Sequence, residues 1–265
     1  MILKIFFFFI GVFLITANFV GQISDLTKHP ITEKVITHKN SIHYYHKNEW
    51  KVELAKYKNI KINDLEQINK IFASSIYHFW NNDNFDKNQI YSFNENWIIF
   101  LFSHFENFLH NHNFISKLYL SNLERLQWEN IMKKGIGYCS QISIALNGYL
   151  RSHNVKSKIL AYDGHIVVLV NNNTIMDADK NVFIEDFKID NVETMKIYNK
   201  YKNAGYSDNE SNQMKEIYNT NFSTFDINEY YPKLFIFVGV TNFFKWLIPV
   251  ILLIYSIKKK KRNEI

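Results

Sequence analysis

Residues 135–179 read GIGYCSQISIALNGYLRSHNVKSKILAYDGHIVVLVNNNTIMDAD, and this stretch decides the predicted fold. It contains the only cysteine of the chain, Cys139, which opens a run of apolar residues at helical spacing. Two strand-like runs, 158–162 and 165–170, follow and are joined by an Asp-Gly turn. Three asparagines then lead into a third run, 174–177. The stretch therefore predicts a helix that begins near Cys139, followed by strands that pair as hairpins.

Three residues of this stretch form a possible catalytic set: Cys139 at the helix start, His165 at the head of a strand and Asp177 at the end of the next strand. A thiol attacks only as the thiolate, which the partial positive charge of a helix N-terminus favours. A histidine can take the thiol proton, and a carboxylate on its other ring nitrogen would hold the ring. Taken singly, the cysteine could be a buried apolar residue, and Asp177 could be a turn residue whose role passes to Asp179.

The order of these residues resembles a known family. G-x-G-x-C at a helix start, then Gly-His heading a strand, then an aspartate at the end of the next strand is similar to the bacterial transglutaminase-like superfamily, whose folds are related to papain. The resemblance covers residues 123–186. It implies an α+β fold with a transglutaminase-like, papain-like core of helices packed on a short antiparallel sheet. It also implies that Cys139 is the nucleophile, His165 the general base and Asp177 the orienting acid.

The chemistry that the resemblance implies is acyl transfer on an amide or ester bond through a thioester. Water as the acceptor gives a peptidase or amidase, and an amine gives a transglutaminase-type enzyme. No metal and no cofactor is expected, and the expected substrate is a peptide, a protein or another component of the cell envelope. The alternative is a catalytically silent transglutaminase-like module that binds peptide or cell-surface polysaccharide at the outer face of a membrane.

Composition narrows the classes of protein. The 265 residues allow one domain of about 200 residues with attached segments. A single cysteine excludes an internal disulfide and a cysteine-rich zinc site. The net charge of +6 owes much to the cluster Lys258–Arg262, and the remainder is close to neutral, so nucleic acid is not an expected partner. No phosphate-cradling glycine loop occurs in the sequence, which makes a nucleotide cofactor unexpected.

Both ends of the chain are apolar enough to interact with the lipid bilayer. Residues 1–21 predict an N-terminal membrane anchor, with a signal peptide as the alternative. Residues 234–257 predict a C-terminal transmembrane helix, although they include a lysine, and residues 258–265 predict a basic cytoplasmic tail. Because cytoplasmic flanks carry the excess of positive charge, both termini are expected in the cytoplasm. Residues 22–233 would then form an extracytoplasmic transglutaminase-like domain.

Apolar residues at helical spacing predict further helices between and after these segments. The densest apolar pattern, at 97–110, predicts a buried helix. A capping-box pattern, Ser-Asn-Leu-Glu, opens the helix that leads to the cysteine. The complete set of further predicted elements is helices over 65–80, 97–110, 123–133, 191–203 and 211–219, and a strand over 182–184.

Overall fold

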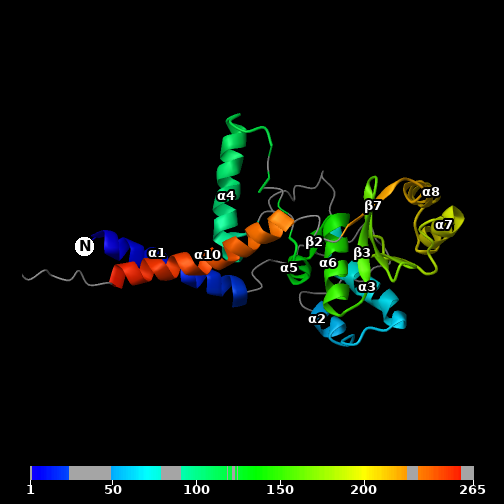
Figure 1. Ribbon diagram of the computed structural model, residues 1–265, viewed down its shortest axis with the longest axis horizontal. Helices are drawn as coiled ribbons and strands as arrows, with labels where there is room; N and C mark the ends of the chain where they lie inside the picture. The colour runs from blue at the N-terminus through cyan, green and yellow to red at the C-terminus, as the bar shows by residue number, and fades with distance from the viewer. Residues whose placement is uncertain are drawn as a thin grey trace, which may run out of the picture. The chain divides into compact units, whose positions relative to one another are not determined.

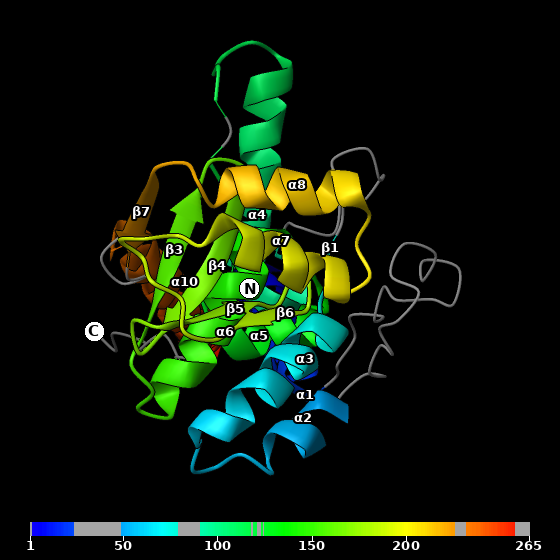
Figure 2. The same ribbon diagram turned by 90° about the vertical axis from the view of Figure 1, so that its right-hand side faces the viewer.

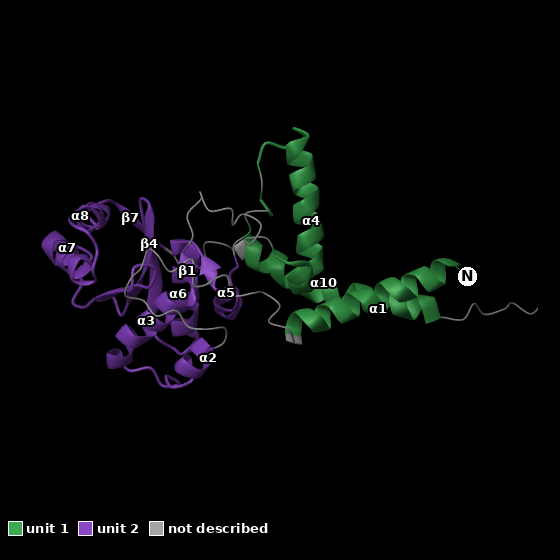
Figure 3. Cartoon of the chain, turned by 180° about the vertical axis from the view of Figure 1, so that it is seen from behind, with its two compact units in different colours: residues 1–27, 84–123, 233–265 green, residues 28–83, 124–232 purple. Residues whose placement is uncertain are grey.

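The computed structural model describes residues 2–23, 49–78, 91–117, 119–120, 123, 125–225 and 232–257. The chain divides into two compact units, which Figure 3 draws in different colours. The helical unit joins residues 1–27, 84–123 and 233–265, and the mixed unit joins residues 28–83 and 124–232. The predicted mixture of helices and strands in an α+β fold is confirmed, and every described strand belongs to the mixed unit.

The mixed unit contains a five-stranded antiparallel sheet with the strand order β6-β5-β4-β3-β7. In chain order its strands are β3 (Ser157–Tyr162), β4 (His165–Val170), β5 (Thr174–Asp177), β6 (Val182–Ile184) and β7 (Phe222–Phe225). The predicted hairpins and the predicted strand at 182–184 are confirmed. The last strand, β7, comes from the end of the unit and pairs with the otherwise free edge of β3.

Helices cover both faces of this sheet, as Figures 1 and 2 show. On one face α6 (Cys139–Ser152) packs against β3 and β4, and it is supported by α3 (Leu65–Ser75) and α5 (Trp128–Lys134). On the other face α7 (Thr194–Asn203) and α8 (Asp208–Ile217) enclose an apolar core with the strands. The short α2 (Glu49–Leu54) and η2 (Ile62–Asp64) pack against α3.

Two tight connections place the ends of β4 and β5. Gly164 adopts a φ of +81° in the turn between β3 and β4, a conformation that a residue with a Cβ rarely adopts. The turn leaves His165 paired with Tyr162. The asparagines at 171 and 172 also have positive φ, which asparagine tolerates better than most residues, and Thr174 then pairs with Val170.

A second, two-stranded sheet lies at the start of α6. Strand β1 (Tyr77–His78) runs parallel to β2 (Ile136–Gly137), with His78 in register with Gly137. This pairing explains why the helix predicted over 65–80 ends at Ser75. The backbone N–H of Tyr77 donates to the carbonyl of Gly135 at 2.9 Å, so tertiary pairing overrides the helical pattern of the preceding residues.

The other predicted helices of the mixed unit form with shifted bounds. The predicted helix 123–133 is observed as α5, which begins five residues later at Trp128. The two polar helices predicted after the sheet are confirmed as α7 and α8. A capping box in which Ser207 and Glu210 bond each other's backbone N–H fixes the start of α8.

The helical unit consists of α1 (Ile2–Ile23), α4 (Phe93–Asn111) and α10 (Pro232–Ile257). Helices α1 and α10 are long and apolar enough to cross a membrane, as predicted. They are antiparallel, because Phe7 contacts Tyr255 whereas Asn18 contacts Lys245. The two ends of the chain therefore leave this helix pair on the same side. The tail at 258–265, predicted to be cytoplasmic, lies outside the described residues.

A proline explains how the three helices bond to one another. Pro249 lies inside α10 and has no N–H, so the carbonyl of Lys245, four residues earlier, lacks its helical donor. The side chain of Asn18 on α1 donates to this carbonyl at 2.7 Å, and the indole N–H of Trp97 on α4 donates at 3.3 Å. The ammonium group of Lys245 in turn donates to the carbonyl of Glu95 at 2.8 Å. One helix defect thus supplies the polar contact between α10, α1 and α4.

Part of the predicted extracytoplasmic segment 22–233, residues 84–123, groups with the terminal helices. One prediction for this region differs from the structure. The helix predicted over 97–110 forms as part of α4, but it is not buried throughout: several of its large apolar side chains are exposed. The physical reason is that α4 packs on α1 and α10 chiefly through its first two turns.

Candidate active site

Cys139 is the first residue of α6 and is half-buried. The turn before it is fixed by the pairing of β2 with β1, and the helix is fixed to the sheet one turn later. There the hydroxyl of Ser143 donates to the carbonyl of Ile166 at 2.8 Å. Residues four apart lie on the same face of a helix, so this bond also directs the face that carries Cys139 toward the start of β4. The thiol thus lies at a helix N-terminus, where the backbone favours negative charge.

His165 and Asp177 meet at the ends of neighbouring strands. The register that pairs Val168 with Met176, extended beyond the last observed pair, sets His165 opposite Asp179 and diagonal to Asp177. In the structure Nε2 of His165 lies 2.8 Å from Oδ2 of Asp177, and both side chains are almost completely buried. Because Nε2 is bound to the carboxylate, Nδ1 is the ring nitrogen that remains for a reacting group.

Three donors among the described residues hold the carboxylate of Asp177. Its Oδ2 accepts from the hydroxyl of Tyr201 on α7 at 2.5 Å as well as from His165, and its Oδ1 accepts from the backbone N–H of Lys180 at 3.1 Å. The hydroxyl of Tyr218 lies 3.2 Å from that of Tyr201. Burial raises the pKa of both tyrosines well above 10, so their protons stay in place as hydrogen-bond donors. These hydrogen bonds hold the carboxylate of Asp177 in one orientation.

The surroundings of His165 favour its charged form. Burial alone would lower the pKa of the imidazole, but the charge and hydrogen bond of Asp177 raise it above 6.5 overall. A hydrogen bond with the side chain of Cys139 and the charge of Asp179 act in the same direction. A charged imidazole beside a thiol is the condition for an imidazolium–thiolate pair.

A second histidine–carboxylate pair lies beside the first. Nδ1 of His78, on β1, lies 2.6 Å from Oδ1 of Asp179, and the ammonium group of Lys180 lies 3.3 Å from Oδ2 of the same carboxylate. Burial would lower the pKa of Lys180, but the charges of Asp179 and Asp177 raise it, with a smaller contribution from Cys139. The buried carboxylates of Asp177 and Asp179 are therefore each paired with a basic side chain.

Three of these groups have spacing that could suit a metal ion. One ligand atom each from His165, Asp177 and Asp179 can be chosen so that all lie within 4.8 Å of one another, and Cys139 is outside this cluster. However, Nε2 of His165 is bonded to Oδ2 of Asp177, which also accepts from Tyr201, and Oδ2 of Asp179 is paired with Lys180. A cation would have to displace these donors, so the bonding pattern favours a protonated imidazole over a metal ligand.

The structure assigns partners that sequence reasoning missed. His78 was overlooked because the helical pattern of 65–80 extended over it, although the Ser74-Ser75 pair marks the point where the helix ends. The sequence offers Asp179 only as a substitute for Asp177, whereas in the structure each of the two carboxylates is paired with a histidine. Tyr201 lies within the helix predicted over 191–203, but no local signal in the sequence indicates that its hydroxyl reaches Asp177.

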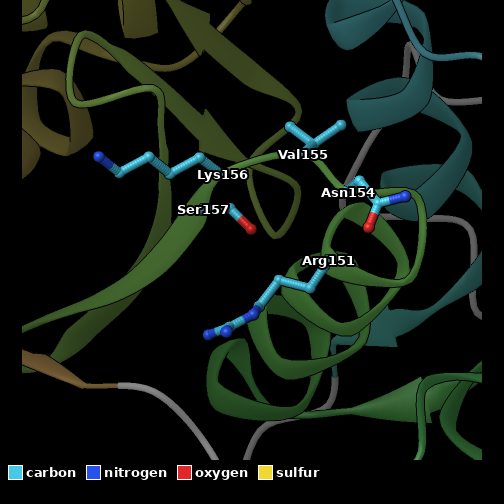
Figure 4. Close-up of a pocket in the computed structure, with 5 residues that line it drawn as sticks. All are labelled: Arg151, Asn154, Val155, Lys156 and Ser157. Atoms are coloured by element: carbon cyan, nitrogen blue, oxygen red, sulfur yellow. The ribbon is translucent and has the colours of Figure 1, made fainter.

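A separate hollow lies at the far end of α6. It has a volume of about 450 Å³ and is lined by Arg151, Asn154, Val155, Lys156 and Ser157, which Figure 4 draws around the junction of α6 and β3. Arg151 lies twelve residues after Cys139 on the same helix, so the two are ~18 Å apart along its axis. The hollow is therefore not part of the thiol site.

No family model, no curated protein and no solved structure matches this chain.

Proposed function

We propose that this protein is a membrane-anchored thiol enzyme that transfers acyl groups, with a transglutaminase-like core in its mixed unit. The observation that carries the proposal is the buried His165–Asp177 pair bonded through Nε2, which leaves Nδ1 for the thiol at the start of α6. The support given to Asp177 by Tyr201 adds to it, because an orienting carboxylate must itself be immobile to fix a ring.

In the proposed reaction, Nδ1 of His165 takes the proton of the Cys139 thiol, and the thiolate attacks the carbonyl carbon of an amide or ester. The carbonyl π bond opens as the carbon–sulfur bond forms, and the backbone N–H groups at the start of α6 are placed to stabilise the oxyanion. The imidazolium then protonates the leaving amine or alcohol as its bond to carbon breaks, which leaves a thioester.

The second half of the reaction repeats these roles. Nδ1 of His165 takes a proton from water or from an amine, and that nucleophile attacks the thioester carbonyl. Collapse of the intermediate breaks the carbon–sulfur bond, and the proton held by the imidazolium returns to the sulfur of Cys139. Water yields a carboxylic acid, as in a peptidase or amidase, and an amine yields a new amide, as in a transglutaminase. Asp177 keeps the ring oriented throughout and is not itself protonated.

The membrane arrangement follows from the helix pair and the flanking charges. Helices α1 and α10 are antiparallel, and the basic cluster follows α10 in sequence. By the positive-inside rule both termini lie in the cytoplasm and the mixed unit lies outside, where cell-envelope peptides and proteins are its substrates. The packing of α1 on α10 supports a retained anchor over a cleaved signal peptide.

The test is the rate of Cys139 alkylation by iodoacetamide as a function of pH, measured on the full chain in membranes. We expect the wild-type midpoint to fall below the value of about 8.5 that a free cysteine shows. His165→Ala should return it to that value, Cys139→Ala should abolish labelling, and His112→Ala, which removes an exposed histidine of the helical unit, should change nothing. In intact cells a membrane-impermeant thiol reagent should label Cys139.

Three results would count against the proposal. An unchanged profile in His165→Ala would exclude that histidine as the base. A wild-type midpoint at the free-cysteine value would favour the silent binding module. Loss of reactivity toward a substrate ester after treatment with a chelator, with recovery on addition of a divalent metal, would assign His165, Asp177 and Asp179 to a metal site instead.

A further inference from the structure

The outer half of α4 carries an apolar stripe with no protein covering it among the described residues. Leu101, Phe102, Phe105 and Phe108 are 51%, 54%, 57% and 52% exposed. At 100° per residue these four side chains fall within one third of the helix circumference. The rest of the circumference carries Ser103, His104, Glu106, Asn107, His110 and Asn111. This half of α4 is therefore amphipathic, with its apolar side facing outward.

The polar side of the same helix is partly covered. The carboxylate of Glu106 is buried and accepts the backbone N–H groups of Tyr119 and Leu120 at 2.7 and 2.8 Å, so the segment after the helix folds back along that side. The other carboxylate of α4, that of Glu95, accepts the N–H of Ser92 in a capping box. Neither charge lies on the apolar stripe, and no lysine or arginine occurs in α4.

The inner half of α4 is fixed between the two candidate membrane spans. The ring of Phe93 contacts that of Phe13 on α1, and a Cβ on Gly21 would collide with the carbonyl oxygen of Asn94, so the backbones are in close contact. On the other side, Asn96 donates to Thr241 and Asn242 of α10 at 3.1 Å. All these contacts involve the C-terminal half of α1 and the N-terminal half of α10.

The direction of α4 relates its apolar stripe to the bilayer. Within the helical unit α4 runs across the antiparallel pair of α1 and α10 and extends beyond it, as Figures 1 and 2 show. If α1 and α10 cross a membrane along its normal, α4 lies roughly in the membrane plane. It lies in the half of the bilayer where α1 ends and α10 begins, and from the contacts with the spans its last ten residues reach ~15 Å sideways.

We propose that the outer half of α4 is an in-plane membrane helix, with Leu101, Phe102, Phe105 and Phe108 in contact with lipid acyl chains. Large apolar side chains of α1 and α10 are exposed as well, and the stripe on α4 is apolar, aromatic and uncharged, as the buried face of an interfacial helix is. The helix would set the height of the helical unit in the bilayer, because it resists movement along the membrane normal.

The test uses spin labels on single cysteines in the full chain, reconstituted into phosphatidylcholine–phosphatidylglycerol vesicles in a Cys139→Ser background. Labels at Leu101→Cys, Phe105→Cys and Phe108→Cys should be relaxed by oxygen and protected from a water-soluble nickel chelate. The matched control is Asn111→Cys, at an exposed position of the same helix outside the stripe, where the nickel chelate should act strongly. Three stripe positions are used so that one poorly folded variant does not decide the result.

The alternative occupants of the stripe give different results. Nickel access at all three stripe positions, equal to that at 111, would place the stripe in water and overturn the proposal. Strong immobilisation with neither oxygen nor nickel access would indicate a protein partner or a second copy of the chain, and would also overturn it. Since the background lacks the thiol, none of these results depends on whether the mixed unit is an enzyme.

Discussion

The two units of this protein satisfy the same physical requirement in different ways. In the mixed unit, buried polar groups converge on Asp177, which accepts from a histidine, a tyrosine and a backbone N–H. In the helical unit, they converge on the carbonyl of Lys245, which accepts from an asparagine and a tryptophan. The first arrangement contains a titratable histidine–carboxylate pair, whereas the second joins three helices through a backbone carbonyl.

The comparison shows that a buried polar cluster indicates a site for chemistry only when it contains groups that can titrate. A backbone carbonyl left without its donor by Pro249 requires partners but cannot exchange a proton. A carboxylate bonded to an imidazole requires partners and also shifts the pKa of its neighbour. The location of the candidate active site follows from this distinction, and the cluster around Asp177 is also the more buried of the two.

The largest expected effect comes from breaking the ion pair of the mixed unit. Asp177→Asn should destabilise that unit by about 3–5 kcal/mol, because it leaves a buried imidazole without its counter-charge. The measurement is thermal unfolding of the full chain in detergent, with Asp163→Asn, an exposed turn position, as the matched control. A loss no larger than that of the control would show that the pair does not stabilise the fold.

The pH dependence of this loss has a definite sign. The folded pKa of His165 is raised above its unfolded value, so the stabilisation is fully present below pH 6.5 and is lost as the pH rises through the folded pKa. The difference between wild type and Asp177→Asn should therefore shrink in alkaline solution. A difference that grows with pH would contradict the raised pKa.

An intermediate effect is expected from Tyr201→Phe, which removes one donor to Asp177 and keeps the ring. A hydrogen bond to a charged group contributes about 1.5–3 kcal/mol, so the melting temperature should fall by less than in Asp177→Asn. Since the variant loosens the carboxylate that holds His165, the alkylation midpoint of Cys139 should also move toward that of free cysteine. The control is Tyr198→Phe, because the hydroxyl of Tyr198 donates to the exposed Asp208. Equal losses of melting temperature in the two variants would show that Tyr201 does not support the site.

The smallest effect is expected in the helical unit. Asn18→Leu deletes the donor from α1 to the Lys245 carbonyl, and hydrogen bonds between membrane helices contribute about 0.6 kcal/mol on average. Thiol cross-linking between Phe7→Cys and Tyr255→Cys in a Cys139→Ser background should decrease modestly. Thr16→Val, whose hydroxyl bonds only within α1, should leave it unchanged. If Asn18→Leu abolished cross-linking as completely as unfolding does, this hydrogen bond would contribute more to the association of the helices than their apolar packing does.

The sequence was most informative where periodicity and turn chemistry agree. The Asp-Gly turn and the run of asparagines predict the hairpins, and these place His165 and Asp177 on adjacent strand ends. What it could not supply was long-range pairing. The contact of His78 with Asp179 spans 101 residues and depends on a two-residue strand that has no pattern of its own.

The misreading of α4 has a related cause. A helix rich in phenylalanine and leucine looks the same in sequence whether its apolar side meets protein or another apolar medium. In the structure the first turns of α4 pack on α1 and α10. The large apolar side chains at the other end of the helix are not enclosed by the described residues.

The contact between Asn18 and the carbonyl of Lys245 also has a consequence for biosynthesis. The two residues are 227 positions apart, so α1 leaves the ribosome long before its partner exists. Throughout that interval the asparagine must be accommodated by other means, while the whole mixed unit is synthesised. The first helix therefore gains its hydrogen-bond partner only when the last helix has been synthesised. A chain that stops short of Pro249 is expected to insert without bonding α1 to α10 in this way.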